Sequence, residues 1–180
     1  MASILGFQLK NFKPTKSTDY TNFVATMYLN GKKIGTYADY GDGGCEEVKF
    51  VSKEAEQEMW KVIVAFANKY PNQGLFGWYN MRPQRYREAK ENFIKTHPYI
   101  PKEDVTVTTM AGASIVFIVG VYLNLLEYEK AFKQYQNKGC RAISVKEDSV
   151  HAYPADWTDE QIRKASEGRT LYMSLDDFVM

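Results

Sequence analysis

The chain has 180 residues, of which 44% are hydrophobic and 25% are charged, a composition typical of a soluble globular protein and not of a disordered one. This length is enough to bury a core and corresponds to one compact domain or to two small subdomains. The 23 basic and 22 acidic residues nearly cancel, which excludes a global electrostatic field directed at DNA or at a membrane.

Cys45 and Cys140 are the only cysteines, so the chain has neither the disulfide scaffold of a small secreted domain nor the closely spaced pairs of a metal knuckle. The first residues, MASILGFQLKNFK, lack the basic start and long apolar run of a signal peptide. The glycines form neither of the patterns that cradle nucleotide phosphates. We therefore expect a cytoplasmic protein without a cofactor.

An antiparallel β-meander is predicted at the N-terminus. Residues 4–12 alternate apolar and polar side chains and predict a first strand. Asn30-Gly31 suits a two-residue type I′ turn, which predicts a hairpin around it. With that turn, the expected pairs are Met27 with Ile34, Ala25 with Thr36 and Phe23 with Ala38. A glycine-rich turn then leads to a further strand through Val48 and Phe50.

A helix that covers the meander is expected next. Ser52 can cap it, and apolar residues recur at steps of three and four. These residues are Ala55, Met59, Val62, Ile63, Phe66 and Tyr70. Pro71 ends this helix, and a domain boundary near this point divides the chain into residues 1–72 and 73–180. Residues 72–80 are predicted to be a loop, and Pro83 fits the first position of a helix that stops before His97-Pro98.

Residues 105–109 alternate β-branched side chains and predict a strand. Residues 115–126 are the most apolar run, and no charge occurs from residue 105 to 126, which raises the alternative of a membrane span. Polar residues within that window and acidic flanks argue against a span. We expect the buried start of a long helix that reaches Gly139, with a buried strand at 115–121 as the competing interpretation.

A second hairpin is predicted at residues 140–153, with its turn at 146–149. Thr158 and Gln161 have the spacing of a capping box and predict a short helix that ends at Gly168. Residues 171–180 are expected to form a strand or a final turn. The fold class is therefore α+β: an N-terminal antiparallel β-meander packed by a helix, then a helical segment, then a C-terminal hairpin with a short helix.

The strongest candidate binding segment combines aromatic and basic side chains. Its residues are Trp78, Tyr79, Arg82, Arg85, Tyr86, Arg87 and Lys90. Guanidinium groups pair with phosphates and aromatic rings stack on exposed bases, so the mixture suits nucleic acid. Trp, Tyr and Arg also dominate protein–protein hot spots. The alternative is a solvated helix face in which Arg87 pairs with Glu91 and Arg85 pairs with Glu88.

Acidic residues gather toward the C-terminus and form a candidate surface for a basic partner. They are Asp156, Asp159, Glu160, Asp176 and Asp177. A second acidic group surrounds a glycine-rich turn and consists of Asp39, Asp42, Glu46 and Glu47. Calcium favours several oxygen ligands around such a turn, but the spacing departs from the EF-hand pattern and also suits a plain turn. No metal ligand is assigned.

Catalytic residues are not assigned either. His97 and His151 are the only histidines, and no spacing connects either of them to a nucleophile.

Two segments resemble small proteins carried by phages and integrated elements of Gram-positive bacteria. They are NGKKIGTYADYGDGGCEEVKF at residues 30–50 and GCRAISVKEDSVHAYPADWTDEQ at residues 139–161. Some proteins of that setting are anti-CRISPR proteins, which bind and block an RNA-guided nuclease. The resemblance implies a non-enzymatic binder of a host protein. The alternatives are a nucleic-acid-binding accessory protein that uses residues 78–90, and a small enzyme or metal-binding protein built on residues 39–47.

Overall fold

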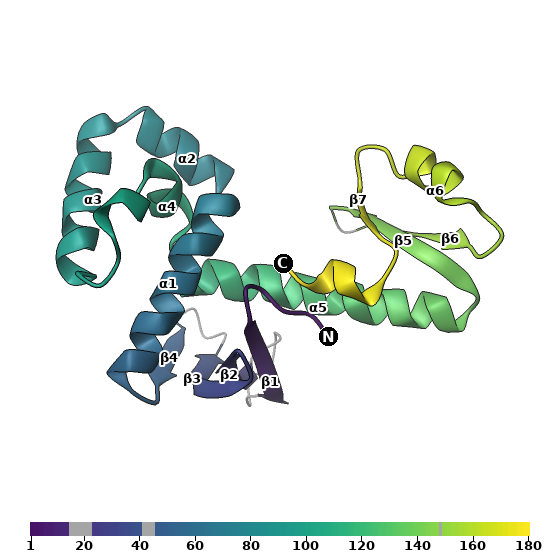
Figure 1. Ribbon diagram of the computed structural model, residues 1–180, viewed down its shortest axis with the longest axis horizontal. Helices are drawn as coiled ribbons and strands as arrows, with labels where there is room; N and C mark the ends of the chain where they lie inside the picture. The colour runs from purple at the N-terminus through teal and green to yellow at the C-terminus, as the bar shows by residue number, and fades with distance from the viewer. Residues whose placement is uncertain (15–22, 41–45, 148) are drawn as a thin grey trace. The chain divides into compact units, whose positions relative to one another are not determined.

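The computed structural model describes residues 1–14, 23–40, 46–147 and 149–180 (Figure 1). The chain divides into two compact units, Leu5–Val119 and a second unit made of Met1–Ile4 with Gly120–Met180. The predicted boundary at residues 72–73 falls inside the first unit. Both units combine helices with antiparallel strands, which confirms the α+β class.

The Leu5–Val119 unit holds a four-stranded sheet and most of the helices. Its elements are β1 (Phe7–Pro14), β2 (Phe23–Leu29), β3 (Lys32–Asp39), β4 (Glu47–Phe50), α1 (Lys53–Lys69), α2 (Gln73–Asn80), α3 (Pro83–Thr96), the 3₁₀ turn η1 (Lys102–Asp104), α4 (Val107–Gly112) and the start of α5 (Ile115–Asn137). The strands follow the order β1-β2-β3-β4, all antiparallel. The predicted meander is thus confirmed, although β1 begins at Phe7 because Leu5 and Gly6 turn with φ of 48° and 83°.

The hairpin turn lies at the predicted dipeptide. Asn30 and Gly31 have φ of 50° and 78°, the left-handed conformation that a type I′ turn needs at both central positions. On either side of this turn, Leu29 pairs with Lys32. The next pair along the ladder, Tyr28 with Lys33, also has the expected register.

Beyond these two pairs the predicted register is wrong by one residue. The observed pairs are Met27 with Gly35, Ala25 with Tyr37 and Phe23 with Asp39, in place of the expected partners Ile34, Thr36 and Ala38. The shift marks a β-bulge at Ile34, whose side chain is buried and whose carbonyl accepts from Val51 N–H at 2.9 Å. A Cβ on Gly35 would lie 2.3 Å from Lys49 O, so only glycine allows β3 to approach β4 this closely.

Helix α1 begins where its cap predicts. Ser52 Oγ accepts a hydrogen bond from Ala55 N–H at 3.2 Å. The apolar stripe includes Met59, Ile63 and Phe66, each at most 1% exposed. Within its unit, α1 packs against β3 and β4 and also against α4 and η1 (Figure 1). Helix α1 therefore packs against both the sheet and the helical part of this unit.

The predicted loop at residues 72–80 is wrong, because this segment is helix α2. Asn72 Oδ1 accepts from Leu75 N–H at 3.2 Å and so caps the helix, although asparagine followed by a glycine-containing segment is also common in turns. α2 packs against α4 and α3, and these contacts favour the helix. The next helix, α3, starts with Pro83 at its first turn and ends before His97, as predicted.

The predicted strand at residues 105–109 is also wrong, because helix α4 begins there. Thr106 and Thr109 form a reciprocal capping box, which overrides the strand preference of their β-branched side chains. Thr109 is fully buried, with its hydroxyl 2.6 Å from Asn68 Oδ1 and 2.7 Å from Asp104 O. Asn68 Nδ2 also donates to Asp104 O at 2.9 Å. This polar cluster joins α1 to the start of α4.

The second unit combines most of α5 with a three-stranded sheet. Its other elements are β5 (Cys140–Lys146), β6 (Ser149–Pro154), α6 (Asp159–Ala165), β7 (Thr170–Tyr172) and the 3₁₀ turn η2 (Leu175–Phe178). The strands follow the order β6-β5-β7, so the predicted hairpin is confirmed. Thr158 and Gln161 form the expected capping box, but α6 ends at Ala165, before the predicted end at Gly168.

Residues 115–121 are helical, so the predicted long helix is confirmed and the alternative of a buried strand is wrong. In the described part of the chain, no helix is both long and apolar enough to cross a membrane.

α5 carries a buried carboxylate, Glu129, which is 3% exposed. Burial by itself raises the pKa of this carboxyl, but hydrogen bonds from Lys133 Nζ (2.5 Å) and Ala2 N–H (2.7 Å) outweigh it and lower the pKa below the usual value.

Candidate functional site

Helices α2 and α3 bring most of the predicted aromatic and basic residues into one line of contacts. We call this set the α2–α3 surface; it consists of Trp78, Tyr79, Arg82, Arg85, Tyr86, Arg87 and Lys90. Trp78 and Tyr79 lie in the last turn of α2, Arg82 lies in the break between the helices, and the other members lie on α3. Arg82 has the non-helical dihedral angles φ −134° and ψ 68°, and Pro83 can begin α3 because the first turn of a helix needs no backbone N–H partner there.

The centre of the surface is a stacked pair. The guanidinium carbon of Arg82 lies 4.8 Å from the ring centroid of Trp78, within the range of a cation–π contact. Trp78 then meets Tyr79 edge to face, with centroids 4.9 Å apart. Tyr79 contacts Tyr86 at 6.3 Å, and Lys90 Nζ lies 6.0 Å from the Tyr86 ring. Five of the seven predicted residues are thereby connected across two helices.

The two remaining arginines differ in their partners. Arg85 lies 3.5 Å from a carboxylate oxygen of Glu88, so the expected pair at this spacing is present. The expected pair of Arg87 with Glu91 is wrong, because no ion pair within the described ranges includes Arg87. Arg87 is exposed. Its charge therefore faces solvent without a carboxylate to neutralise it.

Two exposed apolar residues beside this line were not among the predicted site residues. Met81 is 75% exposed and Leu75 is 47% exposed, while Trp78 itself is 37% exposed. Leu75 stands in the segment predicted to be a loop, where an apolar side chain carries no positional information, and Met81 directly follows that segment. Since α2 is a helix, exposed apolar side chains beside a stacked Trp–Arg pair mark a contact surface.

The predicted acidic residues lie in the second unit and are partly occupied by structural roles. Asp159 forms an ion pair with Arg141. One carboxylate oxygen of Asp177 accepts from Met173 N–H at 2.6 Å and Ser174 N–H at 2.8 Å, so it caps η2. The other predicted acidic residues are also exposed: Asp156 precedes α6, Glu160 lies in its first turn and Asp176 lies in η2.

The loop proposed as a metal site is only partly described. Asp42 lies outside the described residues, while Glu47 accepts from Tyr40 OH at 3.1 Å and pairs with Lys49 at 2.8 Å. Among the residues that the structure describes, no group of three or more His, Cys, Asp or Glu side chains could hold a metal ion. Glu47 thus acts in strand β4 as a partner of neighbouring side chains.

The histidines have separate environments. His97 stacks on Phe93, with centroids 4.2 Å apart, and meets Trp60 edge-on at 4.4 Å. Its Nδ1 lies 2.9 Å from Thr96 Oγ1. His97 therefore forms part of an aromatic cluster at the end of α3, whereas His151 is exposed on β6.

Comparisons with protein-family models, with curated proteins and with solved structures find no match to this chain. Its function is therefore inferred from the surface chemistry and from the resemblance carried by residues 30–50 and 139–161.

Proposed function

We propose that this protein is a non-enzymatic binding protein that docks on a host protein through its α2–α3 surface. Following the resemblance to proteins of phages and mobile elements, the proposed partner is an RNA-guided nuclease, and binding inhibits it in the cytoplasm. The observation that carries the proposal is the exposed Trp78–Arg82 stack, with apolar Leu75 and Met81 beside it.

The chemistry of this surface favours a protein partner. A tryptophan and an arginine that stack on each other present a rigid, amphipathic contact surface. Because their side chains are already ordered, they lose little conformational entropy on binding. Methionine adds an adaptable apolar contact, as in other protein-binding surfaces. Arg85 already pairs with Glu88, which reduces the positive charge available for a phosphate backbone.

The unpaired charge of Arg87, with Lys90 placed over Tyr86, favours nucleic acid as the second candidate. The two candidates differ in how binding responds to nuclease and to salt. Binding to a phosphate backbone falls steeply as salt rises, because counterions are released on binding. A protein interface centred on Trp78 is much less sensitive.

A pull-down with the tagged full chain tests the proposal. The lysate comes from bacteria that express an RNA-guided nuclease, and the capture is repeated after treatment with a nonspecific nuclease. Captured proteins are identified by mass spectrometry. A nuclease-resistant band of the RNA-guided enzyme is expected, followed by loss of DNA cleavage when the purified proteins are mixed.

The double variant Trp78→Ala/Arg82→Ala should weaken capture by about 30-fold, which corresponds to roughly 2 kcal/mol for a hot spot. The matched control is Tyr135→Ala/Lys138→Ala, since Lys138 Nζ lies 5.5 Å from the Tyr135 ring and forms a similar cation–π pair at the end of α5. Equal capture by both variants would contradict the role of the α2–α3 surface. A signal that disappears with nuclease treatment would establish nucleic acid as the ligand instead.

A further inference from the structure

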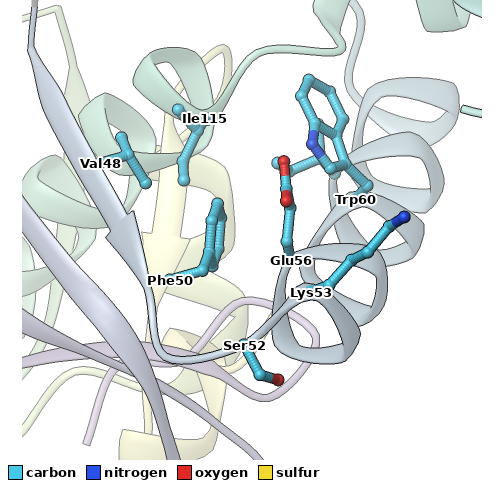
Figure 2. Close-up of a pocket in the computed structure, with 8 residues that line it drawn as sticks. Val48, Phe50, Ser52, Lys53, Glu56, Trp60 and Ile115 are labelled. Atoms are coloured by element: carbon cyan, nitrogen blue, oxygen red, sulfur yellow. The ribbon is translucent and has the colours of Figure 1, made fainter. Parts of the chain in front are cut away.

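A pocket of about 690 Å³ lies between the edge strand β4 and helix α1, entirely within the Leu5–Val119 unit (Figure 2). Its volume is within the range of about 300–1,000 Å³ that is usual for ligand sites. The walls are mostly apolar and include Val48, Phe50, Trp60, Ile63 and Ile115. None of these residues belongs to the α2–α3 surface, so a ligand in this pocket is independent of the proposed function.

One carboxylate, that of the exposed residue Glu56, lines this mostly apolar pocket. Figure 2 shows the Glu56 side chain between the rings of Phe50 and Trp60. In the described ranges of the chain, no ion pair includes Glu56. The charge of Glu56 also reaches Tyr99, whose pKa is raised first by burial and then by this carboxylate. The carboxylate of Glu56 is therefore available to pair with a cation from a ligand.

The aromatic wall is held in place from behind. Trp60 meets Phe93 edge-on with centroids 5.8 Å apart, and it meets His97 at 4.4 Å. A ring fixed in this way loses little freedom when a ligand stacks on it. Aromatic faces attract cations, and a guanidinium group can stack on a ring while it donates to a carboxylate. Lys53 also lines the pocket, but Figure 2 shows it extending away from Phe50.

The strand beside the pocket has a free edge. β4 pairs with β3 on one side, and no other described strand pairs with its opposite side. An exposed edge is a template for an extended segment from another chain. Val48 and Phe50, two residues apart on β4, both line the pocket, so the pocket lies under the face of the sheet that an added strand would extend.

We propose that an extended segment of a partner protein adds to the free edge of β4 and places an arginine or lysine side chain in the pocket, against Glu56 and the ring of Trp60. The cation pairs with the carboxylate of Glu56, and the backbone pairing with β4 fixes the position of the segment. This assigns the partner a basic, strand-forming segment.

Titration of the full chain with three short peptides, followed by NMR, tests this proposal. The first is acetyl-Thr-Val-Arg-Val-Thr-amide, the second carries neutral citrulline in place of arginine, and the third carries N-methyl groups on alternate amides. The reporter is the indole N–H resonance of Trp60, assigned by its absence in Trp60→Phe. The arginine peptide should shift this resonance, and the other two should bind more weakly.

Glu56→Gln should weaken the arginine peptide by about fivefold, as expected for a partly exposed ion pair worth at most about 1 kcal/mol. Glu58→Gln is the matched control, because it removes the same charge from α1 at a residue that pairs with Lys61 at 2.6 Å. Equal affinity of the arginine and citrulline peptides would overturn the cation site. Equal affinity of the N-methylated peptide would overturn strand addition, and no shift at millimolar peptide would overturn both.

Discussion

The buried hydroxyl of Thr109 should contribute measurably to the stability of the Leu5–Val119 unit. This hydroxyl accepts from Thr106 N–H at 2.9 Å, and its one proton can be donated to Asn68 Oδ1 at 2.6 Å or to Asp104 O at 2.7 Å. Thr109→Val keeps the shape of the side chain and removes only these hydrogen bonds. Because the site is 0% exposed, water cannot replace the lost partners without opening the helix junction.

The expected cost of Thr109→Val is about 1–3 kcal/mol, the range for leaving buried polar groups unsatisfied. Urea denaturation followed by circular dichroism measures it as a lower midpoint with an unchanged slope. Thr108→Val is the control on the same helix, since Thr108 is half-exposed and should change stability by less than about 0.5 kcal/mol. Equal midpoints for the two variants would refute the role assigned to the polar cluster.

Three further outcomes are expected. Gly35→Ala should destabilise the sheet by about 1–3 kcal/mol in urea, because the added Cβ would lie 2.3 Å from Lys49 O; a midpoint like that of the native chain would show that β3 can move without cost. The lowered pKa of Glu129 means that its contribution to stability is complete above the ordinary carboxyl pKa and is lost as pH falls through the folded value, so the melting temperature should fall on acidification. Glu129→Gln should flatten that dependence, and an unchanged profile would contradict the lowered pKa of Glu129. Burial, followed by the nearby acidic charges, raises the pKa of Tyr37 to about 12, so stability should fall as pH rises from about 10 to 12; an ultraviolet titration should lose its latest step in Tyr37→Phe.

The parts of the fold that could be predicted are those set by neighbouring residues. Asn30-Gly31 forms its turn, Ser52 begins α1, Pro83 begins α3 and Thr158 begins α6. In each case, the decisive hydrogen bond or dihedral angle involves residues within three positions of one another. Such local signals predict a turn or a helix start independently of contacts with distant residues.

The parts that could not be predicted depend on contacts between distant residues. The bulge at Ile34 accompanies the close approach of Gly35 to Lys49 on the next strand, which a hairpin pattern does not contain. The helix α4 is stabilised by Asn68, which is 41 positions from Thr109 in the chain. The β-branched pattern at residues 105–109 predicted a strand, whereas the structure has a helix that combines this distant contact with the local capping box of Thr106 and Thr109.

The candidate site was predictable in composition but not in arrangement. The aromatic and basic residues were identified from their types alone. The stack of Arg82 on Trp78 spans the break between two helices, and the segment that carries Trp78 was expected to be a loop. The exposure of Leu75 to solvent follows from the same helix, and the exposed Met81 is the C-cap residue of that helix.

Because the sheet and the helical part of the Leu5–Val119 unit both pack against α1, the stability of each part depends on the other. Near the C-terminal end of α1, Ala67 packs closely against Gly112 of α4. A Cβ added to Gly112 would lie 3.1 Å from the Cβ of Ala67. Val64 belongs to a cluster with Phe93 and Ile100. A fragment that ended at residue 72 would expose this apolar side of α1 to water, so the meander and its helix would not be an autonomous folding unit. Slow amide exchange should accordingly extend along the whole of α1, and both parts of the unit should lose protection in one cooperative step.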